Sequence, residues 1–126
     1  MNNHDKNFNH IMTVEQLAKE MDDVNLHDEF RITVINLLSH KCFEDCHIKG
    51  SINVDAVSLA DTVEDWDRTR AIVVYEAAED ITLCEKACKT LNEMGFTDVR
   101  ILQGGMKEWL DQGYATEGAC KMAYVR

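Results

Sequence analysis

Residues 71–95 read AIVVYEAAEDITLCEKACKTLNEMG, and this stretch contains the signals that decide the fold. Its first five residues, up to Tyr75, form a continuous apolar and aromatic run, which predicts a buried strand. Apolar residues at helical spacing follow from Thr82 onward and stop before Gly95, a residue type that commonly follows the last turn of a helix. The stretch therefore predicts a strand, a short loop over residues 76–81 and a helix.

The 76–81 loop joins a strand to the first turn of a helix, a place where backbone N–H groups and the helix dipole commonly bind an anion. Its six residues are Glu76, Ala77, Ala78, Glu79, Asp80 and Ile81. They supply three carboxylates and no basic side chain, so the loop has the expected geometry of an anion cradle but the wrong charge. The helix after it is expected to begin with a capping box formed by Thr82 and Glu85.

The rest of the chain alternates strands and helices in the same manner. Thr13 and Gln16 have the spacing of a capping box and predict a helix that runs to about Met21. The remaining expected elements are strands at residues 31–37, 51–54 and 98–102, and helices at residues 42–46 and 106–111. Strands that alternate with helices predict an α/β domain with a parallel sheet and helices on both faces.

Composition limits the function classes. The chain has 126 residues, 45% of them apolar, which suits one domain with a single core. Its formal net charge of −10 argues against nucleic acid and anionic membranes as partners, and suits either a solvated acidic surface or a face for a basic partner. No apolar run is long enough to span a bilayer, and the first residues lack the apolar core of a signal peptide. We therefore expect a cytoplasmic protein.

Four segments of the chain carry recognisable motifs in a fixed order. They are Val-Ile-Asn-Leu-Leu at 34–38, His-Ile-Lys-Gly-Ser-Ile-Asn at 47–53, Val-Val-Tyr at 73–75 with its loop, and the segment 95–113 with Gly-Phe, Leu-Gln-Gly-Gly-Met, Trp and Gly. Together they resemble the rhodanese-like domain family, and the last segment is the most specific. The resemblance implies a doubly wound α/β domain at residues 12–118, between a flexible arm at 1–11 and a tail at 119–126.

The resemblance also implies a chemistry that this chain departs from. In active members a cysteine directly after the Val-Val-Tyr strand accepts a sulfur atom as a persulfide. Glu76 stands at that position, and a carboxylate cannot form a persulfide. No arginine or lysine between residues 76 and 85 supplies the cation that often stabilises the anion, and the other acids of the loop repel a thiosulfate-like dianion. Asn36 and Leu38 replace the usual aspartate and arginine of the first motif.

We therefore expect a degenerate rhodanese-like domain that is a non-catalytic binding or regulatory module, with an unidentified protein partner, no cofactor and no metal. Glu76 has three alternative roles: an exposed loop residue, a carboxylate folded into the loop that satisfies the donors otherwise available to an anion, or a functional base or cation ligand. The alternative function is a thiosulfate or persulfide sulfurtransferase, or a sulfur carrier, that uses a displaced thiol such as Cys84. A phosphatase-like use of the loop lacks both its cysteine and its arginine.

The chain has five cysteines, at positions 42, 46, 84, 88 and 120. An odd number without a secretion signal predicts free thiols, and Cys120 is expected to be exposed in the tail. Cys84 and Cys88 lie four residues apart on one helix face, which suits small core residues. The alternative is that Cys84, in the first turn, has a lowered pKa and acts as the displaced thiol.

One metal site is formally conceivable. Cys42, Cys46 and His47 lie close together in the sequence, and only the pair Cys84 and Cys88 could complete a four-ligand zinc site with them. This composite site is the weaker prediction. His47 belongs to the family's turn motif and is expected to pack and to form hydrogen bonds instead.

Overall fold

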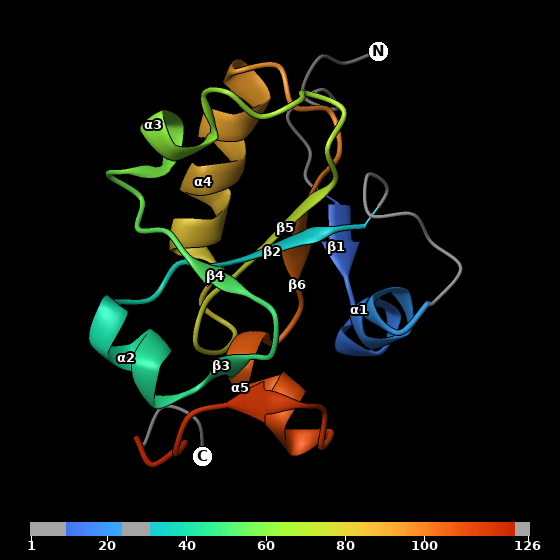
Figure 1. The fold of residues 1–126 in the computed structure, drawn as a ribbon, viewed down its shortest axis with the longest axis vertical. Coiled ribbons are helices and arrows are strands. Elements are labelled where there is room, and N and C mark those ends of the chain that lie inside the picture. Colours follow the sequence, from blue (N-terminus) through green and yellow to red (C-terminus); the bar gives the residue numbers. More distant parts are fainter. Residues whose placement is uncertain (1–9, 24–30, 123–126) are drawn as a thin grey trace.

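The computed structural model describes residues 10–23 and 31–122, and its centre is a five-stranded sheet (Figure 1). In spatial order the strands are β1 (His10–Met12), β6 (Val99–Leu102), β5 (Ile72–Tyr75), β2 (Thr33–Asn36) and β4 (Ile52–Asn53). Every neighbouring pair is parallel. A second, small sheet pairs β3 (His47–Ile48) antiparallel with β7 (Thr116–Glu117).

Helices cover both faces of the large sheet, as the alternation of elements predicts (Figure 1). On one face lie α3 (Leu59–Val63) and α4 (Thr82–Glu93), and on the other lie α1 (Val14–Met21) and α5 (Gly105–Asp111). The short helix α2 (His40–Asp45) leads into β3. Among the described residues, none of these helices is long and apolar enough to cross a membrane.

Strand β5 is the central strand, and its side chains explain the continuous apolar run. Ile72 and Val74 belong to the core under α3 and α4, whereas Val73 and Tyr75 belong to the core under α1 and α5. A strand covered on both faces must be apolar at every position. Because β5 is central, the loop that follows it lies at the middle of the carboxyl edge of the sheet.

The helix ends agree with the sequence at two places and differ at a third. Thr13 and Gln16 form the predicted capping box of α1. At the end of α4, the N–H of Phe96 donates to the carbonyl of Leu91 at 3.0 Å, which is the Schellman arrangement. The predicted capping box of Thr82 is wrong, because the N-cap of α4 is the preceding residue and no side chain of that residue caps the helix.

Contacts of the fold extend into the predicted arm and the predicted tail. Within the predicted arm at 1–11, residues 10 and 11 belong to β1 and pair with β6, while residues 1–9 lie outside the described part. In the tail, Cys120 forms a disulfide with Cys46, so the prediction of free thiols is wrong for these two cysteines. The backbone N–H groups of residues 121 and 122 each donate to the Asp45 carboxylate at 3.1 Å, and residues 123–126 lie outside the described part.

Candidate functional site

The first turn of α5 holds the 76–81 loop from below. The N–H of Met106 donates to the carbonyl of Glu76 at 2.9 Å, and the N–H of Lys107 donates to the carbonyl of Ala77 at 2.8 Å. The first N–H groups of a helix have no acceptor within the helix, and two of those in α5 donate to carbonyl oxygens of the loop. The backbone of the loop is fixed at its first two residues.

This contact requires a glycine at the start of α5. Gly105 has a φ of +60°, and a Cβ atom built on it would lie 2.4 Å from the carbonyl oxygen of Glu76 and 3.0 Å from the backbone nitrogen of Ala78. Only a residue without a side chain allows the two backbones to approach so closely. Gly105 of the Gly104-Gly105 motif is therefore a packing requirement of the loop, whereas a Cβ atom on Gly104 would meet the Cβ of Glu108 at 2.5 Å.

The Glu76 side chain is turned into the loop. It is only 8% exposed, and its Oε1 atom accepts the backbone N–H of Cys84 at 2.9 Å. Cys84 is the third residue of α4, so this N–H has no acceptor within the helix. A carboxylate at a helix N-terminus is also favoured by the helix dipole. Glu76 is therefore not an exposed loop residue. Its carboxylate is folded into the loop and accepts a donor that would otherwise be available to an anion.

A second carboxylate of the loop serves the same helix end from the solvent side. Asp80 accepts the backbone N–H of Thr82 at 3.0 Å and its hydroxyl at 2.7 Å. These hydrogen bonds, the hydroxyl first, hold the pKa of the exposed Asp80 carboxyl below its ordinary value. Two N–H groups of the first turn of α4 are therefore occupied by carboxylates of the loop itself.

The Cys84 thiol lies on the interior side of this arrangement. It is fully buried, and burial is the main cause that raises its pKa, followed by the negative charge of Glu76 and a hydrogen bond to it. The alternative in which Cys84 has a lowered pKa at the helix start is therefore wrong. Burial and the charge of Glu85 also raise the pKa of Cys88 to about 12. Both cysteines are core residues, as their helical spacing indicates.

A buried polar network lies beneath the start of the loop. The phenolic oxygen of Tyr75 accepts the Asn36 side-chain amide at 2.8 Å and the N–H of Ile48 at 3.0 Å. The Ser51 hydroxyl donates to the carbonyl of Ile48 at 2.7 Å, so its oxygen takes the proton of Tyr75 at 3.0 Å. Burial raises the pKa of Tyr75. The network contains no charged group, and the Asn36 amide supplies one of the donors to Tyr75.

The other cysteines do not assemble with this site. Cys46 lies in the core under α1 and α5 and is bonded to Cys120, whereas Cys84 and Cys88 lie in the core on the opposite face of the sheet. The sheet thus separates the ligands of the composite zinc site, which is excluded. Within residues 10–23 and 31–122, no group of three or more histidine, cysteine, aspartate and glutamate side chains is arranged to hold a metal ion.

His47 packs and forms hydrogen bonds, as predicted. Its ring stacks on the ring of Phe43, with the ring centres 3.8 Å apart, and its Nδ1 lies 2.7 Å from the backbone carbonyl oxygen of Phe43. Its Nε2 lies 3.1 Å from the carboxylate of Glu117. The side chain therefore connects α2 to β7 on the side of the molecule that carries the small sheet.

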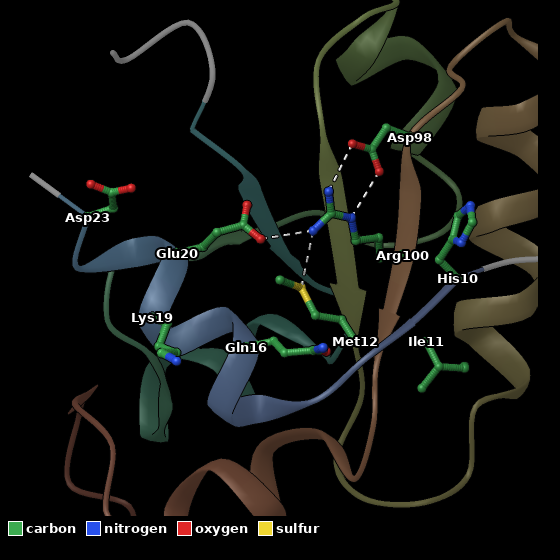
Figure 2. A pocket seen from close by; sticks show the side chains of 9 residues that line it. All are labelled: His10, Ile11, Met12, Gln16, Lys19, Glu20, Asp23, Asp98 and Arg100. Atoms are coloured by element: carbon green, nitrogen blue, oxygen red, sulfur yellow. Dashed lines mark hydrogen bonds and ion pairs between the residues drawn. The ribbon is translucent and has the colours of Figure 1, made fainter. Parts of the chain in front are cut away.

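A pocket of about 610 Å³ lies away from the loop, over β1, β6 and α1 (Figure 2). The Arg100 guanidinium crosses it and is already bound to Asp98, at 2.9 and 3.0 Å, and to Glu20, at 3.0 Å. Arg100 is thus engaged in ion pairs within the fold. The other basic residues that line this pocket, among those the structure describes, are Lys19 and His10. No residue of the 76–81 loop lies here, so that loop remains the candidate site.

Comparison with known proteins agrees with this fold. The family model described as "Rhodanese-like domain" matches residues 13–112. The thiosulfate sulfurtransferase GlpE of Shewanella oneidensis is 28% identical over 104 residues, which cover 81% of this chain and 92% of that relative. The HTH-type transcriptional regulator Rv0324 of Mycobacterium tuberculosis is 28% identical over 78 residues, which cover 62% of this chain and 34% of the regulator.

Solved structures give the same result for the fold. The rhodanese-like domain of the Alr3790 protein from Anabaena sp., determined in solution by NMR, matches with a TM-score of 0.74 at 24% identity. The match covers 92% of this chain and 84% of that domain. At this level of identity the likeness establishes the α/β architecture and leaves the chemistry to the residues of the loop.

Proposed function

We propose that this chain, which belongs to the rhodanese-like domain family, is a non-catalytic member that works as a binding or regulatory module. The observation that carries the proposal is the Glu76 side chain. It follows β5 directly, where the resemblance places the persulfide-forming cysteine, and its carboxylate accepts the N–H of Cys84. A group that cannot form a persulfide thus takes up a donor that an anionic substrate would need.

Electrostatics support the same proposal. Transfer from thiosulfate requires a thiolate to bond to the outer sulfur, while sulfite leaves with the electron pair of the broken S–S bond. The thiosulfate that binds and the sulfite that leaves are both anions, and both must be held near the helix N-terminus. Here the carboxylates of Glu76 and Asp80 occupy donors of that terminus, Glu79 adds a third negative charge, and the 76–81 loop contains no cation.

The alternative function, sulfur transfer through Cys84, has weaker support. The relative named as a thiosulfate sulfurtransferase makes that activity worth testing. However, a reactive thiol is exposed and has a lowered pKa, whereas the thiol of Cys84 is fully buried with a raised pKa. The partial match to a transcriptional regulator suits a regulatory module, although this chain spans only 34% of that protein.

The experiment is the intact mass of the reduced protein after incubation with thiosulfate and, separately, with mercaptopyruvate, followed by peptide mapping. We expect no gain of sulfur at any thiol. A gain of one sulfur that maps to Cys84, and that the Cys84→Ser variant loses, would replace the proposal with the alternative function. The Cys42→Ser variant is the control for adventitious loading of a thiol outside the core.

Restoring a cysteine tests whether the cradle itself is intact. The Glu76→Cys variant frees the N–H of Cys84 and should load sulfur weakly, with better loading when Glu79→Gln and Asp80→Asn are added. The matched control is Glu79→Cys, which places a thiol in the same loop at an exposed position and should not load. Equal loading of the two cysteine variants would contradict the proposal that Glu76 occupies the reactive position.

A further inference from the structure

A groove of about 720 Å³ lies beside the 76–81 loop, at the carboxyl edge of the large sheet. It is lined by residues from the loop, from β1 and β6, and from α1 and α5. This edge of an open α/β sheet is where ligands commonly bind. The volume is in the range of sites that hold a small molecule or a few side chains.

The walls of the groove combine two chemistries. Glu15, Glu79 and Glu108 come from α1, from the loop and from α5, so three separate elements each contribute a carboxylate. Between them lie apolar side chains, including Ile11, which is 52% exposed, and the half-buried Ile81. The described residues that line the groove include no lysine, arginine or histidine.

The negative charge of the groove is compensated only in part from within the fold. The carboxylate of Glu108 accepts the side-chain amide of Gln112 at 2.9 Å, and this donor carries no charge. Lys107, the neighbouring cation on α5, does not line the groove and is paired with Asp111 at 2.7 Å, although the charges of Glu108 and Glu79 also raise its pKa after Asp111. The whole chain adds its net charge of −10 to the same field. A cationic ligand would supply charge complementary to the part that remains uncompensated.

We propose that this groove binds an extended segment of a partner protein in which lysine or arginine side chains alternate with apolar ones. The proposal deepens the proposed function, on which it rests, by naming the class of partner. Cationic side chains satisfy the carboxylates, and the apolar side chains cover Ile11 and Ile81, which a purely polar polycation would leave exposed. Strand β1 lies at the edge of the sheet and beside the groove, where an extended segment can run along it.

The probe is a fluorescently labelled nine-residue peptide, blocked at both ends, in which lysine and valine alternate. Its binding to the full chain is followed by fluorescence anisotropy at two salt concentrations. We expect saturable binding that weakens with salt, and no binding of the matched peptide in which glutamate replaces lysine. Spermine, a polycation without apolar side chains, is the competitor that should displace the peptide only weakly.

Matched variants assign the binding to the groove. The Glu79→Gln/Glu108→Gln double variant should lower the affinity for the peptide about threefold to thirtyfold. The control is Glu64→Gln/Glu93→Gln, which changes the net charge by the same amount at exposed positions outside the groove and should stay within about twofold of the original chain. Ile11→Ser removes an exposed apolar side chain and should also lower the affinity for the peptide about threefold or more.

Several outcomes would overturn the inference. Equal losses in the two double variants would reduce it to net charge alone. Full competition by spermine together with an unchanged affinity of Ile11→Ser would assign the groove to a small polycation. Absence of peptide binding would remove the groove as a docking site, and the sulfur-loading experiment would still stand as the separate test of the non-catalytic proposal.

Discussion

Two neighbouring loops at the carboxyl edge of the sheet differ in what they retain. The 103–105 turn after β6 keeps the glycines of the family motif, and Gly105 lies against the backbone of the next loop. The 76–81 loop after β5 keeps its backbone contacts but carries Glu76 turned inward. In the 103–105 turn, backbone packing excludes a side chain at Gly105. In the 76–81 loop, hydrogen bonds fix the backbone, but the side chains can change.

This difference separates a position fixed by backbone packing from one where a side chain makes a single hydrogen bond to the helix. A change at Gly105 disturbs the loop, α5 and the sheet together, because all three meet at that residue. A change at position 76 needs only a side chain that satisfies the N–H of Cys84, and a carboxylate does so. We therefore expect stability to depend strongly on the 103–105 turn and moderately on Glu76, and this ranking can be broken by measurement.

The largest effect is expected for Gly105→Ala. The new methyl group would meet the carbonyl oxygen of Glu76 at 2.4 Å, and alanine is strained at a φ of +60°. The left-handed backbone and the overpacking together should lower the free energy of unfolding by about 2–5 kcal/mol. Urea denaturation followed by circular dichroism measures this change.

Gly113→Ala is the matched control for the turn. Gly113 has a φ of +81°, but a Cβ atom there would meet nothing within 4 Å. Only the backbone strain remains, and it should cost about 1–2 kcal/mol. Equal losses for the two alanines would show that close packing against the 76–81 loop contributes nothing, and the comparison between the two loops would fail.

The disulfide between Cys46 and Cys120 lies outside both loops, so its effect on stability is a standard against which the effects in the two loops can be compared. Cys46 and Cys120 are 74 residues apart in sequence, so the bond closes a long segment of the unfolded chain. Reduction, or Cys120→Ser, should lower the free energy of unfolding by about 2–4 kcal/mol. Urea denaturation with and without a reductant measures it, and the variant should match the reduced original chain. An identical midpoint in both conditions would contradict the bond.

A smaller effect is expected for Glu76→Ala. It leaves the N–H of Cys84 buried without an acceptor, which should cost about 1–3 kcal/mol. Glu76→Gln keeps an acceptor and loses only the interaction of the charge with the helix dipole, about 0.3–1 kcal/mol. The control Glu79→Ala, at an exposed position of the same loop, should change stability by no more than about 0.5 kcal/mol. If all three behave alike, the inward carboxylate has no structural role.

The sequence predicts those elements whose signal is local. The apolar run before Glu76, the capping box of Thr13 and Gln16, and Gly95 after α4 each act within a few residues, and the structure has them as predicted. Two of the three residues of β1 fall within the predicted arm at 1–11, because so short a strand carries no periodic signal and depends on its pairing with β6. The two-residue strand β7 depends in the same way on β3.

The candidate site is predictable in composition but not in geometry. Residues 76–81 are found from the strand before them and the helix after them. The inward turn of Glu76 depends on a donor eight residues further along, and the partner of Cys46 is found only when the tail folds back. The raised pKa of Cys84 has two main causes, burial and the charge of Glu76. Helical spacing indicates the burial, but nothing in the sequence places Glu76 beside this thiol.

The smallest effect concerns acid stability and compares the 76–81 loop with a matching turn elsewhere. Asp80 accepts from Thr82 as Asp67 accepts from Thr69, and in both turns these hydrogen bonds hold the carboxyl pKa below its ordinary value. Because the folded pKa is lowered, each carboxylate stabilises the fold above the unfolded value of about 3.9, and this contribution is lost as the pH falls through the folded pKa.

Asp80→Asn and Asp67→Asn should therefore each destabilise the chain near neutral pH and converge with the original chain in acid. The measurement is the urea midpoint of each variant between about pH 2 and pH 7. The positive charge of Arg70 also lowers the pKa of Asp67, after its hydrogen bonds to Thr69, whereas Asp80 has only its hydrogen bonds to Thr82, so we expect the loss for Asp80→Asn to be the smaller of the two. A larger loss at Asp80 would show that the side chains of the acidic loop are important for stability, and the distinction between a loop fixed by backbone packing and a loop open to side-chain change would no longer hold.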